Sequence, residues 1–249
     1  MNVLGLTFSE NRWKDISSKF FWKKDDILEI SDGDISKIES LLNFLYPEVL
    51  LLAKDEKYAF VQYLEDIGFT SESNVAIIDI GYSGTIQKCL NRLVNKPVHG
   101  YYCATSHHVK HSMPLSAVTR GCYVEDGKQK FKDSRILSDS FILEKLLSSN
   151  ELQIIRYFFN DEGVLDKELK IKTEKEKLAL PVRNKLQSGV ISYVEKATQV
   201  RNVFAPNFCP SLEIADALYR LFIENINNRE NQIIKKLALD DDYCGRGVV

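Results

Sequence analysis

Residues 74–104 carry a strand, a turn, a helix and a second strand in that order, and this pattern constrains the fold more than any other stretch. Residues 74–80 are apolar with little alternation, as in a strand that is covered on both faces. Apolar residues recur at helical spacing over 86–94 until Pro97 ends the unit, and 98–104 has the composition of a second strand. Such a unit is the usual right-handed crossover between parallel strands, so we expect an α/β fold.

Helical patterns dominate the segments on both sides of this unit. Apolar residues recur at helical spacing over 10–69, where Pro47 is expected to separate two helices. The same spacing predicts helices over 184–202 and 211–238. A third short strand is expected at 121–124, ahead of an Asp-Gly turn signal.

We therefore expect a small, mainly parallel, Rossmann-like sheet flanked by helices. Residues 71–137 would form this α/β core. Residues 1–70 would be a helical N-terminal segment packed on the core, and residues 138–249 a helical C-terminal region that forms one compact unit with it. A chain of 249 residues is long enough for one large domain or two small ones.

Composition argues against several classes of protein. A net charge of −2 gives no sign of a nucleic-acid partner. No apolar run approaches the ~20 residues that span a bilayer, and the N-terminus lacks the basic-then-apolar order of a secretory signal. The 5 cysteines are widely spaced and include no CxxC pair, so neither a disulfide framework nor a zinc knuckle is indicated. A cytoplasmic location is expected.

The turn after the first strand, Asp-Ile-Gly-Tyr-Ser-Gly-Thr-Ile-Gln, is where we expect chemistry. Gly81 and Gly84 can take positive φ and let a ligand approach the backbone, and the helix start supplies free N–H groups. The hydroxyls of Ser83 and Thr85 can bind a ligand or cap the helix. Asp79 can hold a metal, a sugar hydroxyl or a proton, and it is the candidate catalytic residue. A plain strand-to-helix turn, with Asp79 bonded to the local backbone, explains the same residues equally well.

Four known phosphate-site motifs do not fit this turn completely. A Walker A loop needs a lysine that does not follow Gly84, and a dinucleotide fingerprint needs GxGxxG where the chain has only GxxG. The sugar-kinase and actin loop is similar to 79–85 but joins two antiparallel strands, whereas a helix is expected here. The Asp-x-Asp-x-Thr motif of HAD phosphatases would match its nucleophile to Asp79, but Gly81 stands where its general acid should be.

Other candidates lie beyond the turn. Arg120 precedes the third strand and is a candidate anion clamp, with an ordinary surface arginine as the alternative. Glu144 is a candidate acid near the same sheet edge. His107 and His111 are four residues apart and would face one metal only if their segment were helical. A loop that contacts substrate is the alternative interpretation of these histidines.

The turn resembles the motif of a bacterial family. Residues 79–87 are similar to Asp-Ile-Gly-Trp-Ser-Gly-Thr-Ile-Gln, which marks large predicted HAD-superfamily hydrolases, often fused to glycosyltransferases, in O-antigen, capsule and rhamnan loci. Tyr82 stands where tryptophan is usual. Residues 99–102, His-Gly-Tyr-Tyr, resemble the second strand of the family, and Gln187 and Gly189 resemble a later Gln-x-Gly segment. Residues 210–245 resemble the family's closing helices and the acidic turn that follows them.

This resemblance implies a domain that binds a sugar phosphate or nucleotide sugar in bacterial surface-polysaccharide biosynthesis. The expected ligand-binding residues are Gly81, Tyr82, Ser83, Gly84, Thr85, Gln87, Arg120 and Glu144. Any catalysis would be phosphoryl or glycosyl transfer or hydrolysis at Asp79, with Mg²⁺ as a candidate cofactor. The chain resembles the C-terminal portion of the long members, whose HAD domain precedes it. The alternatives are a non-catalytic module that docks a HAD hydrolase or glycosyltransferase, and a remnant without activity.

Overall fold

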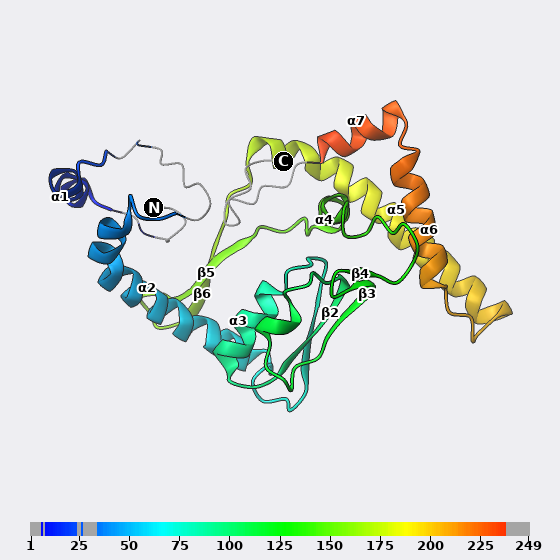
Figure 1. Ribbon diagram of the computed structural model, residues 1–249, viewed down its shortest axis with the longest axis horizontal. Coiled ribbons are helices and arrows are strands. Elements are labelled where there is room, and N and C mark those ends of the chain that lie inside the picture. The colour runs from blue at the N-terminus through cyan, green and yellow to red at the C-terminus, as the bar shows by residue number, and fades with distance from the viewer. Residues whose placement is uncertain (1–5, 7, 24–25, 27–33, 238–249) are drawn as a thin grey trace. The chain divides into compact units, whose positions relative to one another are not determined.

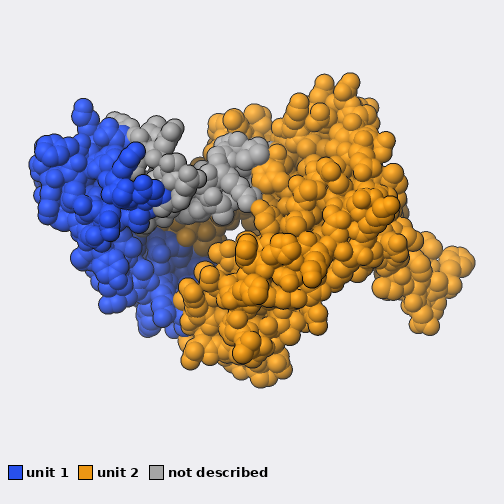
Figure 2. Space-filling view, in the orientation of Figure 1, with its two compact units in different colours: residues 1–62, 156–167 blue, residues 63–155, 168–249 orange. Residues whose placement is uncertain are grey.

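The computed structural model describes residues 6, 8–23, 26 and 34–237 (Figure 1). The expected α/β class is confirmed. The chain divides into two compact units, drawn in different colours in Figure 2. Unit 1 comprises Met1–Gln62 and Arg156–Lys167, and unit 2 comprises Tyr63–Ile155 and Glu168–Val249. None of the described helices is long and apolar enough to cross a membrane.

Unit 2 contains the sheet. Its strands lie in the order β1 (Val75–Asp79), β2 (Val98–Ala104), β3 (Thr119–Glu125) and β4 (Lys128–Gln129). The first three strands are parallel, and β4 pairs antiparallel with β3. Helix α3 (Thr85–Val94) makes the crossover from β1 to β2, as the sequence predicted. Asp79 is in register with Tyr102, which is in register with Gly121, so the carboxyl ends of the parallel strands meet at one edge.

The two faces of this sheet differ in burial. Val75, Val98 and Tyr102 are buried on one face, whereas Ile78 is 91% exposed and Tyr101 is 46% exposed on the other. The expectation that the first strand is covered on both faces is therefore wrong for the face that carries Ile78. An apolar strand without alternation does not reveal from sequence which of its faces stays open.

Unit 1 is built on α1 (Glu10–Phe20) and most of α2 (Glu39–Asp66). Ser9 caps α1, and Ile16 packs with Leu41 and Leu45 in a buried cluster. The expected break at Pro47 is wrong, because α2 is a single helix with Pro47 inside it. A proline removes one helical hydrogen bond, and the packing of Leu41 and Leu45 offsets that loss.

A hairpin that the sequence analysis did not expect interrupts the helical C-terminal half. Strands β5 (Ile154–Phe159) and β6 (Leu165–Leu169) form a two-stranded sheet after α4 (Ser140–Leu147). Its tip belongs to unit 1, where the ring of Tyr58 lies 5.3 Å from that of Phe159 and the ring of Phe60 lies 5.6 Å from that of Tyr157. The turn between the strands contains Gly163 at a φ of +74°.

The remaining helices are α5 (Glu174–Phe204), α6 (Leu212–Glu224) and α7 (Asn228–Lys236). The expected helix over 211–238 is two helices, because Asn227 accepts N–H bonds from Arg229 and Glu230 and begins a new helix there.

Helix α5 contacts the C-terminal end of α4 through Gln187. Its Nε2 donates to the carbonyls of Leu146 and Ser148, both at 2.9 Å. The acidic turn at 240–245 lies outside the described residues.

Candidate functional site

The turn between β1 and α3 begins with a local hydrogen bond. The Gly81 N–H donates to Asp79 Oδ1 at 2.8 Å, as in the plain strand-to-helix turn. Gly81 is not among the described glycines with positive φ, so the left-handed conformation that a glycine permits is used at Gly84 and not at Gly81. Because a carboxylate has two oxygens, this bond engages only one oxygen of Asp79.

Gly84 fits its position for two separate reasons. It is the N-cap of α3 at a φ of +68°, where residues with a side chain are strained. A Cβ there would lie 2.5 Å from Val109 Cγ1 and 3.1 Å from Met113 Cε. The segment after β2 therefore packs directly on the turn, and the Ser106 N–H donates to the Tyr82 carbonyl at 3.0 Å.

The first turn of α3 lies at the surface with two hydroxyls beside it. Ser83 Oγ and Thr85 Oγ1 are 3.1 Å apart, and both residues are exposed. The first helical bond runs from the Lys88 N–H to the Gly84 carbonyl at 3.0 Å. Gly84 has no side chain with which to cap the amides that precede Lys88. Such amides and the helix dipole favour an anion.

Gln87 points into the protein instead of toward this surface. Its side chain is fully buried, and Nε2 donates to the carbonyls of Val98 at 2.8 Å and Val118 at 3.0 Å. Oε1 accepts the hydroxyls of Tyr102 at 3.0 Å and Thr119 at 3.2 Å. Both donors and both acceptor positions of the amide are thus occupied. Gln87 joins α3 to β2 and the start of β3, and it has no hydrogen-bonding position left for a ligand.

Sequence reasoning missed the partners of Gln87. Asn91 accepts the Val98 N–H at 2.8 Å and donates to the Gln87 carbonyl at 2.9 Å. Gly100 lies beneath the amide, where any Cβ would collide with Gln87 Oε1 and the Tyr102 ring. A glycine inside an otherwise apolar strand is the signal that could have indicated this close approach. Burial, with a smaller contribution from the charge of Asp79, raises the pKa of Tyr102 far above that of a free tyrosine.

Tyr82 packs against a buried cluster of Ala104, Val124 and Ile136. Leu143 of α4 and Tyr219 of α6 pack on the same cluster. The Tyr219 hydroxyl donates to the Asp139 carbonyl at 2.9 Å. The structure therefore brings the α4 helix, which carries the half-buried Glu144, to the cluster that anchors Tyr82.

Arg120 lies on the other face of the sheet from Asp79. It is in register with Tyr101, whereas Asp79 is in register with Tyr102, and neighbouring strand residues point to opposite faces. Its guanidinium donates to Glu125 Oε1 at 3.2 Å. The structure does not bring Arg120 to the turn between β1 and α3.

Glu125 forms ion pairs with three cations. Besides Arg120, Lys110 Nζ lies 3.5 Å and Lys130 Nζ 3.1 Å from its carboxylate. Partial burial alone would raise the pKa of Glu125, but the hydrogen bonds and charges of these cations outweigh burial and hold the pKa below its ordinary value. Arg120 thus belongs to an ion-pair cluster around Glu125.

Two of the four histidines, His99 and His107, make local structural contacts. His99 Nδ1 accepts the Val118 N–H at 3.0 Å. The His107 ring lies against the backbone of Gly127, which has a φ of +70°. Among the residues that the structure describes, no three His, Cys, Asp or Glu side chains gather as a metal site.

Comparison of the sequence with known protein families and with curated proteins finds no match. The interpretation of the site therefore depends on its own residues and geometry.

Proposed function

We propose that the turn between β1 and α3 binds the phosphate of a sugar phosphate or nucleotide sugar. The observation that carries this proposal is the start of α3, where Gly84 leaves the first amides uncapped and the exposed Ser83 and Thr85 flank them. A phosphate at this position would accept backbone N–H bonds and both hydroxyls. It lies at the carboxyl edge of parallel strands, where α/β proteins commonly bind ligands.

The binding residues in this proposal are fewer than the sequence suggested. Ser83, Gly84 and Thr85 contact the phosphate, and Asp79 contacts a sugar hydroxyl or a cation with the oxygen that Gly81 leaves free. Tyr82 and Gln87 support the turn from the interior. Arg120 is left out because it pairs with Glu125 on the opposite face.

Mg²⁺ would fit this arrangement as a cation shared between protein and ligand. Asp79 is the only carboxylate in residues 79–87. Mg²⁺ commonly uses one or two carboxylates together with substrate phosphates and waters. The residues present could therefore hold such an ion once a phosphate is bound, with Asp79 as its protein ligand.

The biological setting of the proposal comes from the motif at 79–87. Its similarity to the turn of HAD-associated polysaccharide proteins supports a role in bacterial surface-polysaccharide biosynthesis. Any reaction would be phosphoryl or glycosyl transfer or hydrolysis, with Asp79 as the catalytic residue.

Calorimetric titration with glucose 1-phosphate and UDP-glucose, each with and without Mg²⁺, tests the proposal. The double variant Ser83→Ala/Thr85→Val removes both hydroxyls from the turn and should weaken binding at least about tenfold, since the loss of even one hydrogen bond to a charged group costs ~1.5–3 kcal/mol. The matched control is Ser116→Ala/Thr198→Val, at two exposed sites elsewhere in unit 2. Equal affinities of the two double variants would rule out the pocket.

A docking module for a HAD hydrolase or glycosyltransferase is the second candidate function. The observation that favours it is the open sheet face, with Ile78 almost wholly exposed beside Tyr101. Ile78→Lys should then abolish copurification with the products of neighbouring genes. A chain that binds a sugar phosphate but retains no partner in the same experiment would contradict docking.

A further inference from the structure

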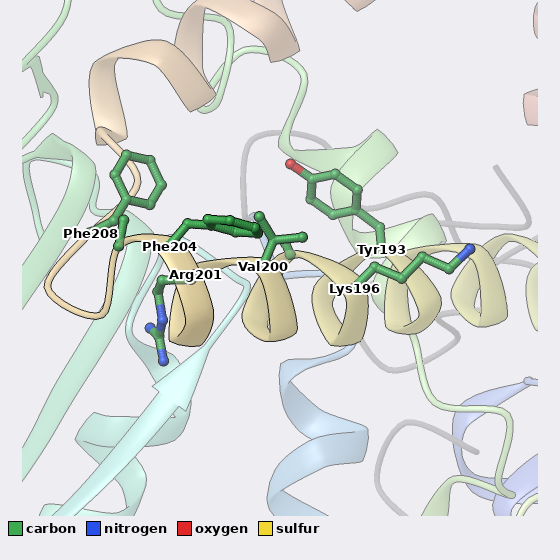
Figure 3. Close-up of a pocket in the computed structure, with 8 residues that line it drawn as sticks. Tyr193, Lys196, Val200, Arg201, Phe204 and Phe208 are labelled. Atoms are coloured by element: carbon green, nitrogen blue, oxygen red, sulfur yellow. The ribbon is translucent and has the colours of Figure 1, made fainter.

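The second half of α5 carries an exposed apolar face that no other described element of unit 2 covers. Eight large apolar side chains, each more than half exposed, lie on 190–208: Val190, Ile191, Tyr193, Val194, Val200, Val203, Phe204 and Phe208. A groove of about 350 Å³ runs along this face. Figure 3 shows Phe208, Phe204, Val200 and Tyr193 in a row on one side of the helix, whereas Arg201 points away from that row.

The exposed face continues a row that is buried earlier in the same helix. Ala179 is fully buried and Arg183 is 2% exposed, and steps of three and four residues lead from them to Val190. The same steps continue through Tyr193, Ala197, Val200 and Phe204. This spacing is the heptad seam of helices that pack side by side. The first half of this side of α5 therefore packs within unit 2, whereas the second half has no partner among the residues that the structure describes in this unit.

The exposed apolar area matches what a stable protein interface needs. The three aromatic and five aliphatic side chains are each more than half exposed. Because an aromatic side chain has ~150–250 Å² of surface to bury, the eight together expose on the order of 800 Å². A standard interface buries about 800 Å² on each partner. Monomeric proteins rarely leave an apolar patch larger than ~300–600 Å².

We propose that two copies of this chain pair through the α5 face formed by 190–208. Ala197 lies at the middle of the exposed seam, so two antiparallel helices that cross there approach closely. Phe204 of each copy then faces Val190 of the other, which pairs a large side chain with a small one. The pairing is independent of the phosphate site.

Sedimentation equilibrium of the full chain tests this pairing. The wild type should have twice the chain mass. Val200→Lys places a charge on the seam beside Lys196 and Arg201, and it should raise the dimer dissociation constant at least about tenfold. The matched control Gln199→Lys adds the same charge at the neighbouring exposed position off the seam and should leave the dimer intact.

The same experiment can also contradict the pairing. A wild-type chain that stays monomeric, or a Val200→Lys variant that remains as dimeric as the wild type, would overturn the pairing. Circular dichroism establishes that each variant is folded. If Val200→Lys is not folded, Phe204→Gln takes its place, and the same two outcomes decide. A monomer whose α5 face instead captures a different protein would also overturn it.

Discussion

Gln87 Oε1 accepts the hydroxyl of Tyr102 at 3.0 Å in the buried layer between α3 and the sheet. Together with the two bonds from Nε2 to strand carbonyls, this contact fixes the helix that follows the candidate site. The position of the first helical turn, and so of the proposed phosphate site, depends on a side chain that touches no ligand.

Gln87→Leu should therefore destabilise the fold strongly. The substitution leaves the hydroxyls of Tyr102 and Thr119 without their acceptor. The Val118 carbonyl keeps the Gly100 N–H, and the Val98 carbonyl keeps a 3.4 Å bond from Asn91. A loss of about 3 kcal/mol in the free energy of unfolding is expected, since each buried polar group left unsatisfied costs ~1–3 kcal/mol. Urea denaturation measures it, with the exposed Gln199→Leu as the control. Equal midpoints for the two variants would contradict the structural role of Gln87.

Two glycine-to-alanine changes should shift stability in opposite directions. Gly100→Ala pushes a methyl group into the Gln87 amide and the Tyr102 ring, and a loss of about 1–3 kcal/mol is expected. Gly189→Ala lies inside α5 with no atom within 4 Å of the new methyl group, so it should gain about 0.5–1 kcal/mol from helix propensity. Thermal unfolding of both variants shows whether each substitution raises or lowers the stability of the fold. A Gly100→Ala protein as stable as the wild type would show that the layer is not tightly packed.

Alkaline stability should depend on Tyr102. Burial raises its pKa in the folded chain, with a smaller contribution from Asp79, whereas the unfolded tyrosine ionises near pH 10. The contribution of the neutral Tyr102 side chain to the free energy of unfolding is therefore complete below about pH 10. It is lost as the pH rises above that value, by about 1.4 kcal/mol per pH unit. Tyr219 is shifted in the same direction, with burial again the largest cause.

Urea denaturation across this alkaline range tests the linkage. Tyr102→Phe should lower stability by about 1 kcal/mol at pH 8, where it removes a hydrogen bond, but should make the loss above pH 10 shallower. Tyr46→Phe, at an exposed site, is the control. Parallel pH profiles for the wild type and Tyr102→Phe would contradict the prediction.

Arg120→Ala should leave ligand affinity unchanged. Its side chain is committed to Glu125 on the sheet face opposite Asp79, so its removal frees no contact at the turn. The stability cost should be below about 1 kcal/mol because Arg120 is exposed and Lys110 and Lys130 still pair with Glu125. Titration with glucose 1-phosphate measures the affinity. A tenfold loss of binding, about 1.4 kcal/mol, would return Arg120 to the site as the sequence first suggested.

The local parts of the fold could be predicted from the sequence, and the parts set by distant contacts could not. The second strand and its preceding helix are marked by periodicity within a few residues. Pro47 and Pro181 lie inside long helices although proline disfavours the interior of a helix, and no local pattern in the sequence reveals this. The hairpin at 154–169 carried a usable signal, since β-branched and aromatic residues precede an Asn-Asp-Glu-Gly turn.

The candidate site shows the same limit. The positive φ of Gly84 and the exposed hydroxyls beside it follow from the residue types in the turn. The burial of Gln87 does not, because its partners lie on β2 and β3, up to 32 residues away in sequence. The separation of Arg120 from Asp79 depends on strand register, which no local pattern reveals.

Thr85→Glu gives the most direct test of the proposed phosphate site. A carboxylate in the first turn of α3 should stabilise the helix by about 0.3–1 kcal/mol while it repels an anion from the same amides. We predict a fold at least as stable as the wild type, with an affinity for glucose 1-phosphate or UDP-glucose reduced at least about tenfold. The control Ser116→Glu, which adds the same charge at an exposed site elsewhere in the chain, should bind as the wild type does. Unchanged binding by Thr85→Glu, or no binding of either ligand by the wild type, would contradict the account.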